Sequence, residues 1–237
     1  MVRVITIDGP GGVGKSTVAS MLAERLQWRH LDTGAMYRAA TLAVLEAGLA
    51  PEDEEAMAAL VRGLHLEFRD VGGESRVLCN GRDVTALIRS PEVSRATSQV
   101  ADVIGVRRHM VAHQRQIGLE RPSVAEGRDM GTVVFPDAMV KFYIDAALDE
   151  RARRRYGDLK RRGLVQSLDE VRADIERRDQ RDRSRPYGAL RIAPGAIVID
   201  TTELTAAQVV DLMTAVIQHC EPADCLQAEQ ADASYSG

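Results

Sequence analysis

The sequence contains few cysteines and no long apolar run, and each shortage excludes a class of protein. The three cysteines, Cys79, Cys220 and Cys225, are widely spaced and include no C-x-x-C pair. This pattern indicates neither a disulfide framework nor a zinc site. No apolar stretch approaches the roughly 20 residues that a membrane-spanning helix needs. The opening residues, MVRVITIDGP, also lack the apolar core of a signal peptide. We therefore expect a cytoplasmic protein with reduced cysteines and no membrane partner.

Lysine is scarce as well, and positive charge is unevenly distributed. The chain has 31 Lys and Arg residues, of which only three are lysines. Residues 151–191 carry a net charge of +7, whereas the whole chain carries −4. A basic segment in an otherwise acidic protein indicates a local anionic ligand more than general nucleic-acid binding, which favours a broadly positive surface. The alternative is a solvated helical face.

One of the three lysines stands in a phosphate-binding motif. Residues 9–16 read GPGGVGKS and match G-x-x-x-x-G-K-[ST], between a β-branched run and a helix-period stretch. The glycines allow backbone N–H groups to turn inward around a phosphate at the positive end of the following helix. Lys15 can then reach the β- and γ-phosphates, and the Ser16 hydroxyl can ligate Mg²⁺. The predicted ATP-binding residues are Gly9, Pro10, Gly11, Gly12, Val13, Gly14, Lys15, Ser16 and Thr17.

The rest of the chain alternates between extended and helical patterns, which predicts an α/β fold with a parallel sheet. Its 237 residues suit one core with an inserted subdomain. Several of the expected strands end in an aspartate, at the edge where parallel sheets place their ligands. Thr205 is the expected N-cap of the last helix. Strands are expected at residues 4–8, 29–32, 123–126, 140–145 and 196–200, and helices at 15–27, 34–47, 100–117 and 205–219.

Two regions depart from this alternation. Extended runs on either side of Asn80-Gly81 predict a hairpin, and hence a small antiparallel sheet inserted in the core. The arginine-rich stretch is helical in pattern, with expected breaks at Gly157 and Gly163, and we interpret it as a mobile cover. The predicted division is a core of residues 1–50, 99–150 and 192–220, an inserted subdomain at 51–98, a lid with its following helix at 151–191, and a disordered tail at 221–237.

Three further segments carry side chains suited to an anion. In DTGAMYR at residues 32–38, Thr33 would cap a helix and Arg38, one turn in, could face the ligand. In EGRDMGT at 126–132, two glycines bracket an adjacent Arg and Asp, which a surface turn would also explain. In RRDQRDRSR at 177–185, Arg178 and Asp182 could pair. Helical spacing there collects three guanidiniums on one face, and a bound phosphate would relieve their repulsion.

Together these segments resemble one family. The motifs IDGPGGVGKST, LDTGAMYR, SQVA followed by VRR, EGRDMGTVVFPDA and RRDQRDRSR, in this order and spacing, are similar to those of the bacterial cytidylate kinases, which are P-loop nucleoside monophosphate kinases. The similarity spans residues 2–216. The resemblance implies a five-stranded parallel sheet with helices on both faces, an enlarged monophosphate-binding insertion and a lid. It also implies Mg²⁺-dependent transfer of the γ-phosphoryl group of ATP to CMP or dCMP.

The resemblance also implies roles for individual residues. The expected catalytic residues are Lys15, Arg128 and Arg185. The acceptor phosphate and the transferred group are assigned to Arg38, Arg128 and Arg185, the ribose hydroxyls to Arg178 and Asp182, and cytosine to Ser98, Arg107 and Asp129, with Thr33 and Tyr37 also in the CMP site. Thr33 stands where many relatives carry serine, and Ser16 where some have glycine.

The cytosine assignment agrees with the chemistry of the base. Cytosine presents an amino donor beside two acceptors, so a carboxylate or hydroxyl can take its N4 hydrogens while a guanidinium donates to the ring. Uracil inverts two of these three positions. Phosphoryl transfer itself needs positioning and charge neutralisation, and no strong general base. Asp32 and Asp129 could orient groups, and Arg154 and Arg162 could contribute from the lid.

Three other functions remain open at this point. The chain could be a P-loop kinase for another acceptor, such as UMP, AMP or shikimate. It could be a nucleotide-dependent switch, although it contains no N-K-x-D guanine motif. Residues 151–191 could be a nucleic-acid-binding arm, which would show a steep salt dependence. We favour the kinase, acting as a monomer on ATP and CMP or dCMP, without nucleic acid.

Overall fold

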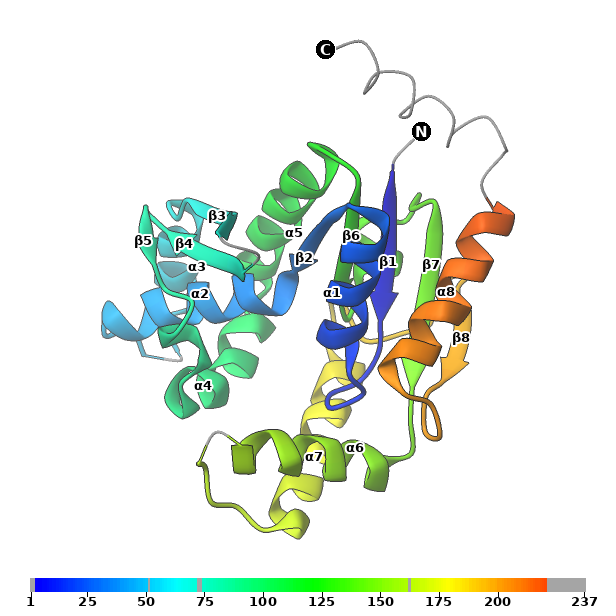
Figure 1. The fold of residues 1–237 in the computed structure, drawn as a ribbon. Coiled ribbons are helices and arrows are strands. Elements are labelled where there is room, and N and C mark those ends of the chain that lie inside the picture. Colours follow the sequence, from blue (N-terminus) through cyan, green and yellow to red (C-terminus); the bar gives the residue numbers. More distant parts are fainter. Residues whose placement is uncertain (1–2, 51, 72–73, 162, 221–237) are drawn as a thin grey trace.

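Five parallel strands form the central sheet of the protein (Figure 1). The computed structural model describes residues 3–50, 52–71, 74–161 and 163–220. The strand order is β2-β6-β1-β7-β8, and every neighbouring pair is parallel. The expected fold class is therefore confirmed, and each expected strand agrees with the structure to within one residue. The strands are β1 (Val4–Asp8), β2 (Arg29–Asp32), β6 (Ser123–Gly127), β7 (Val140–Asp145) and β8 (Ile197–Asp200).

Helices cover both faces of this sheet, because the strands are apolar on both sides. Successive side chains of a strand point to opposite faces. On β1, Ile5 and Ile7 pack into the cluster formed with α1 and α8, and Val4 packs into the cluster on the opposite face. All three side chains are fully buried. The flanking helices are α1 (Lys15–Leu26) and α8 (Ala206–Cys220) on one face, and α2 (Thr33–Glu46) and α5 (Ile104–Leu119) on the other.

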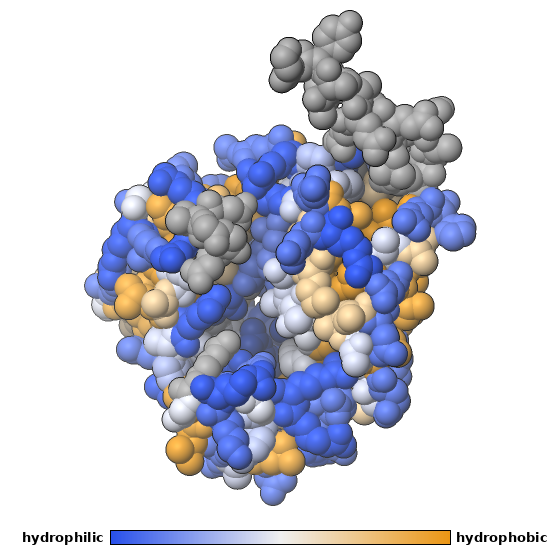
Figure 2. Space-filling model, viewed as in Figure 1, coloured by the Kyte–Doolittle hydropathy of each residue, from blue (hydrophilic) through white to orange (hydrophobic). Residues whose placement is uncertain are grey.

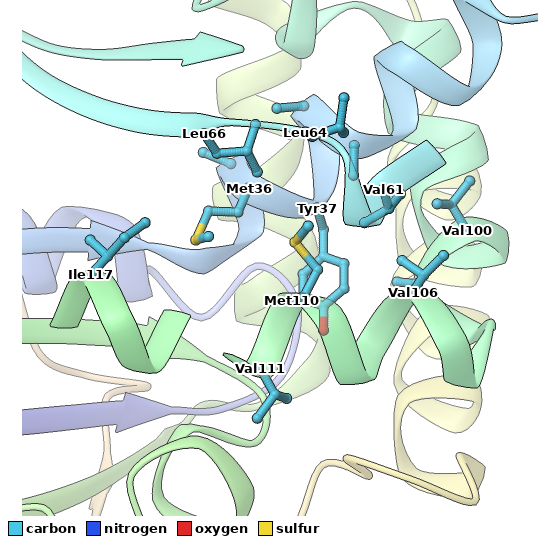
Figure 3. Close-up of a cluster of buried hydrophobic side chains, with 14 of the residues drawn as sticks. Met36, Tyr37, Val61, Leu64, Leu66, Val100, Val106, Met110, Val111 and Ile117 are labelled. Atoms are coloured by element: carbon cyan, nitrogen blue, oxygen red, sulfur yellow. The ribbon is translucent and has the colours of Figure 1, made fainter. Parts of the chain in front are cut away.

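A small antiparallel sheet lies beside α2, as the hairpin pattern predicted. Asn80 and Gly81 form its two-residue turn with φ angles of 50° and 79°, which is the left-handed geometry such a turn requires. Figure 3 shows the junction with the core, where Met36 of α2 lies near Leu66 and Met110. The elements of this part are α3 (Glu54–Arg62), β3 (Leu66–Val71), β4 (Glu74–Cys79) and β5 (Arg82–Asp83).

The single helix expected at residues 100–117 is wrong. The structure has two helices, α4 (Pro91–Asp102) and α5, separated by Val103 in an extended conformation. The sequence does mark the start of α4, because Ser90 is a good N-cap residue and proline at position 91 favours the first turn of a helix. In the structure the Ser90 hydroxyl accepts a hydrogen bond from the Val93 N–H at 3.2 Å. A short 3₁₀ turn, Leu87–Arg89, precedes it.

The arginine-rich region forms two packed helices, α6 (Leu148–Arg161) and α7 (Leu168–Ser184). The expected break at Gly157 is wrong, because this glycine lies inside α6. A small apolar cluster of Ala152 and Leu159 against α7 holds that helix together and offsets the roughly 1 kcal/mol cost of a glycine. Gly163 lies beyond the end of α6 with φ of 72°. The proposed domain boundaries remain a prediction.

Thr205 receives a hydrogen bond from the Gln208 N–H at 3.3 Å, which confirms it as the cap of α8. Among residues 3–220 as described, no helix is both long and apolar enough to span a bilayer. The expected disordered tail at 221–237 lies outside the described residues, as do Arg162 and Cys225.

Two glycines in helices should respond oppositely to the same substitution. A Cβ on Gly118 of α5 would lie 2.5 Å from the Phe135 ring, whereas a Cβ on Gly157 has no atom nearer than 3.6 Å. Gly118→Ala should lower the free energy of unfolding by about 1–3 kcal/mol through overpacking. Gly157→Ala should raise helix stability by about 0.5–1 kcal/mol. Chemical denaturation followed by circular dichroism measures both, and changes of the same sign would contradict the packing described here.

Candidate active site

A large cleft opens at the carboxyl edge of the central sheet, between α2, α4 and the α6–α7 pair. Its volume is about 2050 Å³. Pockets for one small ligand usually occupy roughly 300–1,000 Å³, so the cleft has room for two. Figure 2 shows the hollow near the centre of the molecule, with strongly hydrophilic residues of α6 and α7 below it. The cleft is therefore suited to polar, charged ligands.

Residues 11–17 of the phosphate loop form one wall of this cleft. Gly14 precedes α1 in a left-handed conformation with φ of 95°, and no side chain caps α1 in the described structure. Its first N–H groups are thus available to an anion. The Lys15 ammonium is buried and donates to the Pro10 carbonyl at 2.7 Å. Burial and the adjacent Arg128 guanidinium lower the pKa of Lys15 well below its usual value, and a bound polyanion would oppose that shift.

Part of the loop faces the helical pair. The Gly11 N–H donates to Asp179 Oδ1 at 3.1 Å, so this N–H does not point inward as the motif predicted. Gly9 and Pro10 lie outside the lining of the cleft, and an added Cβ on Gly9 would approach the Ile144 carbonyl oxygen to 2.1 Å. The remaining predicted ATP-binding residues line the cleft.

Glu126 is a site residue that sequence reasoning missed. It is the penultimate residue of β6, is buried, and accepts a hydrogen bond from the Ser16 hydroxyl at 3.0 Å. Its other carboxylate oxygen lies 3.1 Å from His30 Nε2. In the sequence, the only signal was an acidic residue near the end of an expected strand. Its hydrogen bond to Ser16 could not be predicted, because that contact depends on β6 pairing with β1. No group of three or more His, Cys, Asp or Glu side chains that could hold a metal ion occurs among the described residues. Ser16 and Glu126 nevertheless place a hydroxyl and a carboxylate next to each other at the phosphate loop.

Asp8, at the end of β1, was also missed. Its carboxylate oxygens accept hydrogen bonds from the Met130 and Gly131 N–H groups at 2.9 and 2.8 Å. Burial raises the pKa of Asp8 to about 6, although these two bonds oppose the shift. Asp8 thereby fixes the short π-helix Met130–Val134 to the central strand. The same backbone carries Arg128 and Asp129 into the cleft.

A buried carboxylate organises the arginines at the centre of the cleft. Asp182 is 1% exposed, accepts a hydrogen bond from Arg128 Nε at 2.7 Å, and forms an ion pair with Arg185 Nη2, also at 2.7 Å. Burial alone would raise the pKa of Asp182, but these guanidiniums hold it below its usual value. The predicted pairing of Asp182 with Arg178 is therefore wrong, because Asp182 pairs with Arg128 and Arg185 instead. Arg185 is further held by Asp102 at 2.5 Å.

Arg178 lines the cleft beside this cluster. Surrounding protein and the neighbouring Arg128 guanidinium lower the pKa of Arg178 to about 10. The side chain is still charged at neutral pH. A bound anion would relieve its repulsion with Arg128, which lies outside the group of three arginines that helical spacing brought together.

The start of α2 differs from the prediction in one respect. Asp32, and not Thr33, caps the helix, because Asp32 is the extended residue and its carboxylate accepts from the Ala35 N–H at 2.8 Å. Thr33 is already helical, and its hydroxyl donates to the Glu126 carbonyl at 2.6 Å. Arg38 lies one turn into α2 and lines the cleft, held by Asp32 at 3.0 Å.

The far end of the cleft contains a buried Arg–Asp pair. Arg107 is 2% exposed, donates to Asp129 Oδ2 at 2.6 Å, and lies 5.3 Å from the centre of the Tyr37 ring. Figure 3 shows Tyr37 between α2 and α5, near Met110. The Tyr37 hydroxyl is buried without a hydrogen-bond partner in the described structure. Ser98 of α4 lines the same cleft.

Gly188 completes this end, and sequence reasoning did not single it out. Its φ is 66°, and an added Cβ would lie 2.2 Å from Asp129 Oδ2 and 2.4 Å from Arg107 Nη2. Any other residue would collide with the buried pair. The signal in the sequence was a lone glycine, whose importance appears only when the chain after α7 folds back over Asp129.

Comparisons with known proteins give one consistent result. The family model described as cytidylate kinase matches residues 5–219. The chain is 44% identical over 220 residues to a cytidylate kinase of Geobacter sulfurreducens, covering 93% of this chain and 94% of the relative. It is 45% identical over 223 residues to a cytidylate kinase of Syntrophotalea carbinolica, covering 92% and 95%.

A solved structure of an uncharacterized protein from Eubacterium ventriosum has a TM-score of 0.50 at 13% identity, over 92% of this chain and 99% of that one, and shows likeness of fold alone. The extent of the family match and the identity to curated relatives decide the assignment. The chain belongs to the cytidylate kinase family.

Proposed function

We propose that this protein transfers the γ-phosphoryl group of ATP to CMP or dCMP, with the phosphate loop holding ATP and the Arg107–Asp129 end holding the nucleotide base. The observation that carries the proposal is the position of Arg128. Its guanidinium nitrogen Nη2 lies 3.9 Å from the Cβ position of Gly11 in the phosphate loop, and its Nε bonds to Asp182. Arg128 is also adjacent in sequence to Asp129. It thus lies between the two proposed nucleotide sites, where a phosphoryl group would pass.

Base recognition is proposed to rest on Asp129, Arg107 and Ser98. The Asp129 carboxylate can accept the N4 hydrogens of cytosine, and Arg107 can donate to the ring acceptors. Because Arg107 and Asp129 are both almost fully buried, a base with the opposite pattern would leave polar groups unpaired. Each such group costs on the order of 1–3 kcal/mol. Tyr37, under the guanidinium, would support the base pocket.

Phosphoryl transfer is proposed to depend on charge neutralisation and alignment, with no general base. Lys15 would contact the β- and γ-phosphates, while Arg38, Arg128 and Arg185 would hold the acceptor phosphate and the moving group. The ribose hydroxyls are assigned to Arg178 and Asp182, and Thr33 lines the same cleft. In this arrangement Asp182 has a second role, because it keeps the two central guanidiniums in place.

Magnesium is proposed to accompany ATP. The Ser16 hydroxyl and the Glu126 carboxylate provide hard oxygen donors beside the phosphate loop. This donor set fits Mg²⁺, which in phosphotransferases usually takes one or two protein oxygens and completes its shell with phosphates and water. When bound, the ion would neutralise charge on the β- and γ-phosphates. The cytoplasmic location and the monomeric state stay predictions.

Lys15→Ala should lower kcat for CMP phosphorylation by at least about 100-fold, because a charge aimed at the transferred group is lost. The fold should persist, since α1 keeps its packing. Lys160→Ala is the matched control, as Lys160 is exposed on α6, and it should match the unmodified protein. A coupled assay of ADP release measures both, and near-normal turnover of Lys15→Ala would refute the role given to this lysine.

Acceptor preference tests the proposed substrate directly. We expect kcat/KM for CMP and dCMP to exceed that for UMP by roughly 30-fold or more, because uracil inverts two hydrogen-bonding positions against a buried pair. AMP should also be a poor acceptor, because a purine is larger than the pyrimidine that this end of the cleft is proposed to bind. Asp129→Asn should narrow the CMP-to-UMP ratio. Equal use of UMP or AMP would instead favour a related kinase for another acceptor.

ATP binding should also be linked to proton uptake by Lys15. The pKa of Lys15 is lowered in the free protein, and the negative triphosphate should raise it. As the pH rises through the lowered pKa, the free protein loses a proton that ATP binding restores. Calorimetric titrations with ATP measure this uptake. They are run at several pH values above the phosphate pKa of about 6, each in buffers of different ionisation enthalpy. Lys15→Arg should abolish it, because a guanidinium stays protonated; equal uptake in both proteins would exclude Lys15 as the source.

A further inference from the structure

One glycine of the phosphate loop has both of its backbone groups held by side chains of the α6–α7 pair. The Gly11 N–H donates to Asp179 Oδ1 at 3.1 Å, and the Gly11 carbonyl accepts from Arg151 Nη1 at 3.1 Å. Arg151 and Asp179 also bond to each other. Arg151 comes from α6 and Asp179 from α7, so one ion pair joins both helices to the loop.

The ion pair is buried and fixed at more than one point. The side chains of Arg151 and Asp179 are 7% and 5% exposed. Arg151 Nε donates to the Ala146 carbonyl at 3.0 Å, just after β7. The guanidinium is thereby tied to the sheet on one side and to the phosphate loop on the other. This leaves Gly11 little freedom to turn.

Direct packing supports the same connection. Gly12 has φ of 76°, and an added Cβ would lie 2.9 Å from the Arg151 carbonyl oxygen. The loop therefore rests on the backbone of α6. The Cβ position of Gly11 is 3.7 Å from Asp179 Oδ1 and 3.9 Å from Arg128 Nη2. A change in the orientation of Gly11 would consequently reach the proposed path of the phosphoryl group.

Stability alone does not account for this pair. Buried ion pairs can often be replaced by apolar residues of similar volume without loss of stability. Apolar residues cannot, however, donate to a carbonyl or accept from an N–H. What is specific to Arg151 and Asp179 is that they satisfy both backbone groups of Gly11 at once.

We propose that Arg151 and Asp179 are positioning residues that hold the phosphate loop ready for ATP and make its shape depend on the α6–α7 pair. The inference rests on the proposed function, because ATP is the ligand assigned to the loop. Without the pair, the loop must be ordered when ATP binds. Ordering the backbone of about one residue corresponds to roughly a tenfold loss of affinity.

The chain offers a matched control. Arg172 of α7 bonds to Asp149 of α6 at 2.8 Å, and both side chains are exposed. This second ion pair also joins α6 to α7, and none of its described bonds reaches the phosphate loop. Substituting it tests whether any link between the two helices suffices.

The experiment compares the double variants Arg151→Met/Asp179→Leu and Arg172→Met/Asp149→Leu with the unmodified protein. Thermal unfolding, calorimetric Kd for ATP and for CMP, and steady-state kinetics are measured for each. For Arg151→Met/Asp179→Leu we expect a folded protein with a lowered Tm, because the Gly11 N–H and carbonyl lose their partners. We also expect Kd and KM for ATP raised about tenfold, and values for CMP within about twofold. The control variant should leave Kd and KM unchanged for both ATP and CMP.

An unchanged ATP affinity in a folded Arg151→Met/Asp179→Leu protein would overturn the inference, and so would equal losses for ATP and CMP. If that variant does not fold, Arg151→Lys decides, because lysine keeps the charge but cannot donate to the Gly11 and Ala146 carbonyls together. ATP affinity should then fall while stability changes little, and unchanged affinity would count against the proposal. An unmodified protein that binds ATP without phosphorylating CMP would refute the proposed function only, since the ATP Kd tests the inference separately.

Discussion

The cleft depends on one electrostatic constraint, which is that several guanidiniums must stay close together before any ligand arrives. Each central arginine is held by a carboxylate: Arg128 and Arg185 by Asp182, and Arg107 by Asp129. Unpaired, these charges would repel one another and strongly disfavour burial. Paired, they can be buried, and their remaining N–H groups still face the cleft. The carboxylates therefore preorganise positive charge that two polyanionic nucleotides require as neighbours.

The parallel sheet is what brings the acidic residues to this position. All five strands end at the same edge, so Asp8, Asp32 and Glu126 come from three different strands and meet at one place. Each then holds a different neighbour: Asp8 holds the backbone after Asp129, Asp32 holds the start of α2, and Glu126 holds Ser16. The ends of the strands thus position the phosphate loop, the start of α2 and the segment after Asp129 together, as expected for open α/β sheets.

Features governed by local chemistry could be predicted from the sequence. The phosphate loop, the strand ends and the hairpin at Asn80-Gly81 each depend on a few adjacent residues, and the structure has all three. Local chemistry could not show which of two adjacent residues with similar side chains takes a given structural role. Asp32 and Thr33 are both good cap formers, and only the position of the Glu126 carbonyl directs the Thr33 hydroxyl away from the helix.

Partners far apart in sequence could be inferred only where a family resemblance supplied them. The grouping of Arg107 with Asp129 followed from such a resemblance, whereas the bond between Gly11 and Asp179, across 168 residues, did not. Glu126 was missed for a related reason, since its bond to Ser16 exists only because β6 lies next to β1. The position of Gly188 over Asp129 likewise depends on how the chain returns after α7.

Two carboxylates of α7 lie one turn apart, and each faces a different one of the two proposed nucleotide sites. Asp179 faces the phosphate loop, and Asp182, one turn later, faces the arginines of the acceptor side. Because a helix is stiff over a single turn, the two carboxylates cannot move independently. A shift of α7 that alters the hold of Asp179 on Gly11 must also alter the hold of Asp182 on Arg128 and Arg185. The geometry of the proposed ATP site and that of the proposed acceptor site are therefore mechanically linked through this turn.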